Sequence, residues 1–292
     1  MDVVDAKQLE DRLNKRDYFP DEGLVAAAVL AQRLRKPVFL EGEPGVGKST
    51  FAEAMAGVLD PDAVLIRLQC HSGLDAGQAL YDWDFPRQVL TLRAADRGDA
   101  VPVTDLYRPE FLVRRPVLAA FEKPSVLLID EIDRADDEFE ACLLEVLDKG
   151  TISIPELGPE QSGITMRMPF IVLTSNDTRE VHGALKRRCI YHWIEHPKPP
   201  REAEILEHKI DGLTVELAAE IAEAMKRLRA DGVLTRPPGV AEAIDLARSV
   251  VASGAKTLAE DAAISCAGAV AKHRDDVDTV RRVLGEVGRD SA

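Results

Sequence analysis

The octapeptide GEPGVGKS, residues 42–49, constrains this chain more than any other feature of its sequence. It matches the pattern G-x-x-x-x-G-K-[ST], in which glycines let backbone N–H groups turn around phosphates while the lysine and the hydroxyl reach phosphate and Mg²⁺. The apolar run 38–40 precedes it and a helical pattern over 49–59 follows, so the segment indicates a strand, a loop and a helix. The motif therefore predicts a nucleotide-binding site made by Gly42, Glu43, Pro44, Gly45, Val46, Gly47, Lys48, Ser49 and Thr50.

Strand and helix patterns alternate through the first two thirds of the chain. Apolar runs at 38–40, 64–68, 125–129, 169–174 and 190–194 predict strands, and helical spacing appears at 21–34, 49–59, 135–149 and 179–187. This alternation predicts an α/β fold with a parallel five-stranded sheet flanked by helices. After the Pro-Lys-Pro-Pro stretch at 197–200 no strand pattern recurs. We therefore expect an α/β nucleotide-binding domain over 1–196 and an all-helical domain over 197–292.

Two carboxylates, Asp130 and Glu131, follow the apolar run 125–129. The carboxyl edge of a parallel sheet is where ligands bind. Asp130 is suited to hold Mg²⁺ together with Ser49, and Glu131 is suited to orient and deprotonate an attacking water. The acidic residues that come next are interpreted as helix-start and solvated-face charges; they are Asp133, Asp136, Asp137 and Glu138.

Polar and basic residues follow the next strand. Asn176 stands directly after it, where its amide either approaches a γ phosphate or forms a turn. Lys186, Arg187 and Arg188 then close a predicted helix just before the run 190–194. Basic residues at this place serve either the helix dipole or a nucleotide held by a neighbouring subunit. The residues alone leave both alternatives open.

Four elements follow one another in this chain: the phosphate loop, the strand that ends in two carboxylates, the strand that ends at Asn176, and the basic residues before the last strand. In this order they resemble the AAA+ ATPases. The resemblance implies ATP and Mg²⁺ as cofactors, a C-terminal helical lid and a homo-oligomeric ring, expected to be hexameric. It also implies that Asn176 is the residue called sensor 1 and that Arg187 or Arg188 is the arginine finger, with Arg188 favoured because it directly precedes the last core strand. Arg236, in LTRPPGVAEAI at the start of a lid helix, corresponds to sensor 2, the alternative being a surface or capping arginine.

Three longer segments resemble the MoxR group, and within it the CoxD-like ATPases of carbon monoxide dehydrogenase maturation. They are IRLQCHSGLDAGQALYDWDFPRQVL at 66–90, IDEIDRADDEFEACLLEVLDKGTISIPELG at 129–158 and RPPGVAEAIDLAR at 236–248. The chain departs from the group at Asp133, often an asparagine there, and at 187–189, where D-R-F is common. The resemblance implies a chaperone-like remodeller with a von Willebrand factor A domain partner and a client metalloenzyme. Tyr81 and Trp83 either touch a client or pack in the core.

Composition limits the other functions that such a core can have. Asp and Glu number 51 against 37 Lys and Arg, for a net charge of −14, which repels a phosphate backbone and disfavours a nucleic-acid partner. No apolar run approaches the roughly 18 residues that span a bilayer, and the N-terminus has no signal-peptide pattern, so we expect a cytoplasmic protein without an integral membrane segment. The alternatives are a nucleic-acid motor or loader, a small-molecule P-loop kinase, or a remodelling ATPase unrelated to metal centres.

Overall fold

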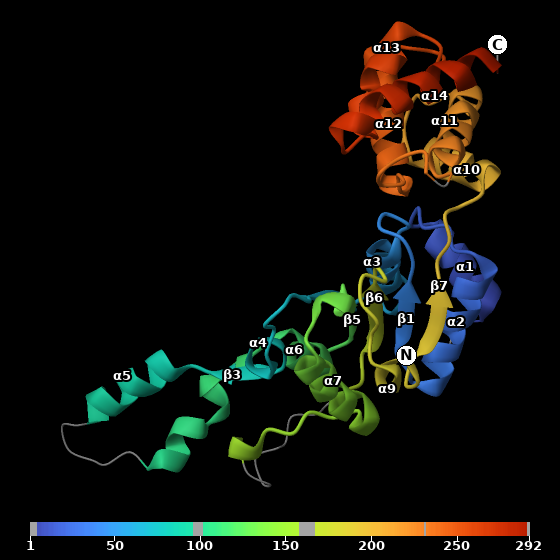
Figure 1. Ribbon diagram of the computed structural model, residues 1–292. Coiled ribbons are helices and arrows are strands. Elements are labelled where there is room, and N and C mark those ends of the chain that lie inside the picture. The colour runs from blue at the N-terminus through green and yellow to red at the C-terminus, as the bar shows by residue number, and fades with distance from the viewer. Residues whose placement is uncertain (1–4, 96–101, 158–166, 231, 291–292) are drawn as a thin grey trace. The chain divides into compact units, whose positions relative to one another are not determined.

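The computed structural model describes residues 5–95, 102–157, 167–230 and 232–290 (Figure 1). The chain groups into two compact units. The first consists of the residues up to Leu13, Pro20–Glu41 and Ser49–Trp193, and the second of Asn14–Phe19, Gly42–Lys48 and the residues from Ile194 on. Gly158, the last residue of one MoxR-like segment, lies outside the described residues.

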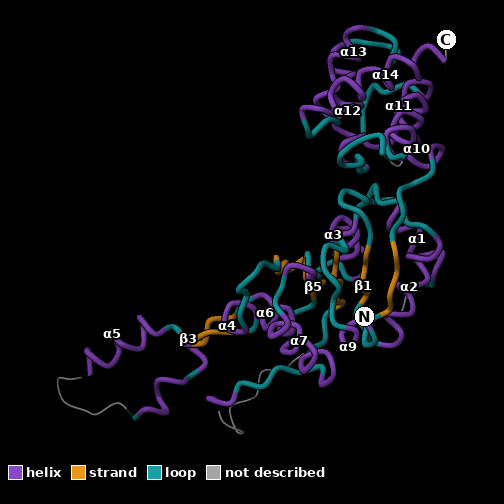
Figure 2. Tube along the Cα trace, in the orientation of Figure 1, coloured by secondary structure: helices purple, strands orange, loops and turns teal. Residues whose placement is uncertain are grey.

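Five parallel strands form the sheet of the first unit, drawn in orange in Figure 2. They are β1 (Val38–Glu41), β2 (Val64–Gln69), β5 (Ser125–Asp130), β6 (Phe170–Ser175) and β7 (Ile190–Trp193), in the spatial order β2-β5-β6-β1-β7. Every residue of β5 and β6 is buried, as expected for central strands of a parallel sheet. The predicted five-stranded parallel sheet is confirmed. Because β5, β6 and β1 are neighbours, the residues at their carboxyl ends meet at one edge.

The first unit also contains helices, some of which flank this sheet. Their bounds are α1 (Ala6–Asn14), α2 (Glu22–Leu34), α3 (Lys48–Leu59), α4 (Ala76–Ala79), α5 (Phe85–Ala95), α6 (Pro116–Glu122), α7 (Asp137–Lys149) and α9 (Gly183–Lys186). Asp21 caps α2 by accepting a hydrogen bond from the Leu24 N–H at 2.9 Å. The helix predicted over 179–187 is wrong in extent, because only Gly183–Lys186 is helical. The residues before it bond to a neighbouring segment instead of to one another.

A short antiparallel ribbon, β3 (Tyr81–Trp83) with β4 (Leu112–Arg114), was not predicted, because three-residue strands leave no periodic signal. The 3-10 helices η1 (Val103–Tyr107) and η2 (Pro109–Phe111) precede β4. Trp83 is buried in the core and meets the Tyr107 ring edge-on, with 5.1 Å between centroids. Tyr81 donates its hydroxyl to Glu156 at 3.1 Å. For Trp83 the core-packing alternative therefore holds.

The second unit is helical from residue 199 on, in the part that the structure describes. Its helices are α10 (Pro199–Lys209), α11 (Val215–Leu228), α12 (Val240–Ser253), α13 (Asp261–Ile264) and α14 (Val277–Asp290), with the 3-10 turns η5 (Ser265–Ala269) and η6 (Arg274–Asp276). Leu206, Ile221, Met225 and Leu246 are fully buried in its core. Beside them Arg229 donates to both oxygens of the buried Glu202, at 2.6 and 2.7 Å.

None of the described helices is both long and apolar enough to cross a membrane.

Candidate active site

The predicted phosphate loop forms the connection between β1 and α3. Gly45 and Gly47 adopt φ angles of 81° and 94°, which only glycine adopts readily. Lys48 is 6% exposed, and its Nζ donates to the carbonyl oxygens of Gly42 at 2.6 Å and Glu43 at 2.8 Å. The lysine therefore closes the loop from inside. Such turns present backbone N–H groups to an anion, so the loop fits a phosphate chain.

The segment before α12 lies directly against this loop. The Gly45 carbonyl accepts from the Val240 N–H at 3.1 Å, and a Cβ on Gly239 would lie 2.7 Å from the Gly45 Cα. Arg236 belongs to this segment but stands four residues before α12 begins at Val240, so it is in the preceding loop and not at the helix start. Its side chain is exposed and makes no hydrogen bond or ion pair with any residue that the structure describes.

A histidine of the second unit, from the segment that follows β7, contacts the phosphate loop as well. His196 Nε2 lies 2.8 Å from a carboxylate oxygen of Glu43. Burial, with the nearby Arg229, lowers the pKa of His196, so the neutral ring donates through Nε2 at neutral pH. Glu43, Pro44 and Thr50 are all exposed, and the side chain of Glu43 is held by this contact.

Asp130 closes β5 and is 3% exposed. Its Oδ1 accepts from Ser49 Oγ at 2.9 Å and from Thr174 Oγ1 at 2.5 Å, and Arg67 pairs with its Oδ2. The two predicted Mg²⁺ ligands are thus in direct contact, and a hydroxyl next to a carboxylate is the hard oxygen pair that Mg²⁺ takes in proteins. Burial, and then Asp130, raise the pKa of the neighbouring Cys70 to about 12, so that thiol stays neutral.

Glu131 follows with a left-handed backbone, φ 56° and ψ 52°. For a non-glycine residue this conformation costs roughly 1–2 kcal/mol, and the hydrogen bond from its N–H to Thr174 Oγ1, 2.9 Å, helps to hold it. Its carboxylate accepts from Asn176 Nδ2 at 3.1 Å and from Gln69 Nε2 at 2.8 Å. Strain held in place by neighbours is a frequent feature of functional sites. The structure therefore brings Glu131 and Asn176 together.

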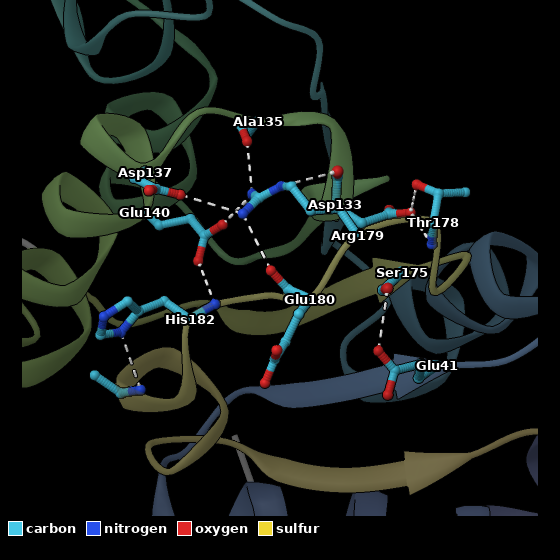
Figure 3. A network of polar contacts seen from close by, with 11 residues as sticks. Glu41, Asp133, Ala135, Asp137, Glu140, Ser175, Thr178, Arg179, Glu180 and His182 are labelled. Atoms are coloured by element: carbon cyan, nitrogen blue, oxygen red, sulfur yellow. Dashed lines mark hydrogen bonds and ion pairs between the residues drawn. The ribbon is translucent and has the colours of Figure 1, made fainter.

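The loop after Asn176 is bonded to the segment after Glu131 by a polar network (Figure 3). Asp133 is 3% exposed, and its Oδ2 accepts from the Thr178 N–H at 3.1 Å and from Thr178 Oγ1 at 2.5 Å. The prediction that Asp133 is a solvated charge is therefore wrong. It lies in the 3-10 helix η3 (Ile132–Arg134), where the turn directs the carboxylate inward, towards the loop after β6.

Arg179 is the centre of this network (Figure 3). Its guanidinium pairs with the fully buried Glu140 and donates to the Ala135 carbonyl at 2.7 Å, and Glu140 also accepts from the His182 N–H at 2.8 Å. These bonds replace the helical ones that sequence periodicity predicts for residues 179–182. They fix the loop between Asn176 and α9 to the beginning of α7.

Replacing Arg179 by Met is expected to destabilise the first unit strongly, because Glu140 keeps its charge and loses the cation paired with it. Breaking a buried pair costs about 3–5 kcal/mol, and we expect about 3 here since Arg179 is 38% exposed. Urea unfolding followed by tryptophan fluorescence measures this, because Trp83 and Trp193 both lie in the first unit. Lys149→Met, which breaks the exposed pair with Glu145, should cost less than about 1 kcal/mol. Equal effects of the two changes would contradict the prediction.

The two candidate finger arginines follow α9 and differ in their surroundings. Arg188 donates to both carboxylate oxygens of Asp148 in the last turn of α7, one of them at 2.7 Å, and to the Ala184 carbonyl at 2.9 Å. Arg187 is exposed, and its side chain bonds to no residue that the structure describes. Neither arginine contacts Glu131 or Asn176 of its own chain in the interactions that the structure gives.

Several residues of the site were missed in the sequence, namely Arg67, Gln69, Thr174, Arg179 and Glu140. The signal that locates the first three is strand register. Gln69 pairs with Asp130 across β2 and β5, and Ile129 pairs with Leu173 across β5 and β6, which puts Thr174 beside Asp130. Arg179 and Glu140 had no such signal, because neither is in a strand.

The model of the AAA domain, dynein-related subfamily, matches residues 37–189, which include β1, the phosphate loop, Asp130, Glu131, Asn176 and both arginines. The chain belongs to this AAA family. An AAA domain indicates an ATPase that uses nucleotide and Mg²⁺, and proteins with this domain typically form oligomeric rings.

Curated relatives of this AAA protein are distant. It is 26% identical over 239 residues to the uncharacterized protein YehL of Escherichia coli strain K12. The matched residues cover 73% of this chain and 61% of YehL. It is 29% identical over 181 residues to the chaperone protein ClpB of Meiothermus ruber, covering 58% of this chain and 19% of ClpB. The AAA chain thus spans less than two thirds of the length of either relative.

Solved structures with a similar fold include the RuvB Holliday junction branch migration motor of Thermotoga maritima, at 18% identity and a TM-score of 0.45 over 94% of this chain and 69% of that one. A mutant form of the same RuvB aligns at 20% identity and a TM-score of 0.46, over 90% and 68% of the two chains. Likeness at this level carries no information about the activity of the AAA protein.

Proposed function

We propose that this AAA protein hydrolyses ATP in a homo-oligomeric ring, expected to be hexameric, and uses the reaction to remodel a client protein. The observation that carries the proposal is the contact between Glu131 and Asn176, at 3.1 Å, beside the contact between Ser49 and Asp130 at 2.9 Å. A general base, a polar group to orient the reacting atoms and a pair of Mg²⁺ ligands are what phosphoryl transfer to water requires.

Each residue has a role in this proposal. The phosphate loop and Lys48 hold the phosphates, and Ser49 with Asp130 would hold Mg²⁺, which would supply positive charge against the phosphates. Glu131 accepts a proton from the attacking water, which Asn176 orients. Arg236 senses nucleotide from the lid, and Arg188 or Arg187 reaches the nucleotide of the next subunit. Residues 1–196 then form the ATPase domain and 197–292 the lid.

We further propose that the client is a metalloenzyme whose metal centre is being completed, such as a molybdenum hydroxylase of the carbon monoxide dehydrogenase type. The support is the resemblance of segments 66–90, 129–158 and 236–248 to CoxD-like MoxR ATPases, together with similarity to a relative named as a chaperone. By the same resemblance a protein with a von Willebrand factor A domain acts beside the ring. The net charge of −14 is unfavourable for work on nucleic acid.

ATPase rates measured with different additions test this function. The apo form of a carbon monoxide dehydrogenase, with its von Willebrand factor A protein, is expected to raise the rate, whereas single-stranded DNA is not. Lys48→Ala is the negative control and should weaken ATP binding about 30-fold or more, the equivalent of losing one buried charged contact of about 2 kcal/mol. Stimulation by DNA would instead support a nucleic-acid motor. Equal stimulation by any unfolded protein would support a remodeller unrelated to metal centres.

A further inference from the structure

An ion pair with a buried carboxylate and a partly exposed lysine joins the residue that precedes the phosphate loop to the helix that ends at the candidate finger arginines. Glu41 closes β1 and is 4% exposed. Lys186, the last residue of α9, places its Nζ 2.9 and 3.0 Å from the two carboxylate oxygens of Glu41. The function proposed above uses neither residue.

Other groups complete the surroundings of this pair. Glu41 also accepts from Tyr191 Oη at 2.9 Å and from Ser175 Oγ at 3.2 Å, a contact drawn in Figure 3. The Lys186 ammonium lies 5.2 Å from the centre of the Phe39 ring and 5.8 Å from that of Tyr191. Rings at this distance stabilise a cation further. The pair thus has one well-defined arrangement, in which Lys186 is bound to Glu41 at the end of β1 and Glu41 is bound to Ser175 at the end of β6.

The ion pair holds the end of the short helix α9, directly before Arg187 and Arg188. A helix of four residues, Gly183–Lys186, cannot hold its own orientation, since isolated short helices are unstable in water. At its start the segment is fixed through Arg179 and Glu140, and at its end through Lys186 and Glu41. Arg187 and Arg188 follow immediately. Lys186, together with the fully buried Leu185, therefore helps to position the backbone from which they extend. Ser175 in the same cluster directly precedes Asn176.

We infer that Lys186 is a positioning residue for the arginine finger: its ion pair with Glu41 fixes the segment from which Arg187 and Arg188 reach the ATP site of the neighbouring subunit. This inference rests on the proposed ring ATPase. The alternative role is in cis: Lys186 would act on the ATP site of its own subunit, through Glu41 and the phosphate loop that follows Glu41. The two roles predict opposite results when variants are mixed in one ring.

The expected result for Lys186→Met alone is unchanged ATP affinity with a loss of kcat of about 10²-fold, which is what a misplacement of about 1 Å costs a reacting group. Lys7→Met, an exposed lysine of α1, is the matched control and should keep the parent rate. Because the single change leaves Glu41 buried without its cation, the double variant Glu41→Gln/Lys186→Met is made in parallel. Whichever of the two is folded by circular dichroism goes into the mixtures.

Mixed rings decide between the two roles. If Lys186 positions the finger, its variant has an intact ATP site, so mixing with Glu131→Gln restores hydrolysis and mixing with the finger variant Arg188→Ala does not. The reverse pattern, or lost ATP affinity in Lys186→Met, would overturn the inference. Glu131→Gln mixed with Arg188→Ala tests the trans arrangement itself, with Arg187→Ala substituted if Arg187 is the finger. If this control recovers hydrolysis but the Lys186 mixtures give the reverse pattern, only the role of Lys186 is rejected. If the control fails with both Arg188→Ala and Arg187→Ala, the trans finger is rejected as well.

Discussion

Glu131→Gln is expected to bind ATP and Mg²⁺ like the parent and to hydrolyse ATP about 10²–10⁴-fold more slowly, the range that a positioned general base contributes. An amide cannot take a proton from water, but it has the shape of the carboxylate and its oxygen still accepts the hydrogen bond from Asn176 Nδ2. Ser49, Asp130 and the phosphate loop are unchanged. Binding is measured by calorimetry and turnover by phosphate release.

Glu138→Gln is the matched control for this change. It removes the same charge from the same acidic stretch, but Glu138 is exposed in the first turn of α7 and its side chain bonds to no residue that the structure describes. Its rate should equal that of the parent. Normal turnover by Glu131→Gln would show that another group is the base.

Arg188→Ala is expected to lower the hydrolysis rate about 10³-fold or more if Arg188 is the finger, since an arginine finger contributes 10³–10⁵ in kcat. Activity per protomer should also rise with protein concentration, because a finger that acts in trans requires assembly. The decisive measurement mixes Arg188→Ala with Glu131→Gln, each inactive alone. Some interfaces in the mixed ring then join an intact Glu131 site to an intact arginine, and hydrolysis returns.

The pairing of Arg188 with Asp148 supplies a control for this prediction. Asp148→Ala breaks the same ion pair but keeps the guanidinium. If the pair were only structural, Asp148→Ala and Arg188→Ala would lose activity together. If the guanidinium acts on nucleotide, Asp148→Ala remains active. A mixture that co-assembles in a pull-down and stays inactive would turn attention to Arg187, whose exposed side chain has no partner among the described residues.

Local patterns in the sequence were sufficient for the sheet and the phosphate loop. The five apolar runs correspond to β1, β2, β5, β6 and β7. The central strands β1, β5 and β6 are buried throughout, and a strand buried on both faces must be continuously apolar. Gly45 and Gly47 were identifiable because their positive φ angles need glycine. Asp130 and Glu131 were predicted to lie at the carboxyl edge of the sheet. Asn176 ends the next strand, so its contact with Glu131 follows from the parallel arrangement of β5 and β6.

The same reasoning failed where a side chain bonds to a residue far away in the sequence. Asp133 and Thr178 are 45 residues apart, and Arg179 and Glu140 are 39 apart. Hydrogen bonds to these partners outweigh the local preference of residues 179–182 for helix, which is worth only a fraction of a kcal/mol per residue. No periodicity records such a pairing, so the charge of Asp133 looked like a solvated one.

The sequence by itself therefore determined that this chain forms a phosphate loop on a parallel sheet, with two carboxylates and an asparagine at its edge, and that a helical region follows. Only the tertiary structure decided which groups bond to these carboxylates: Thr174 and Arg67 to Asp130, and Gln69 to Glu131. It also decided that Lys186 pairs with Glu41, the residue before the phosphate loop. The physical reason is that strand and loop conformations depend on neighbours in the chain, whereas ion pairs and hydrogen bonds depend on which strands lie side by side. That order, β2-β5-β6-β1-β7, is a property of the folded sheet.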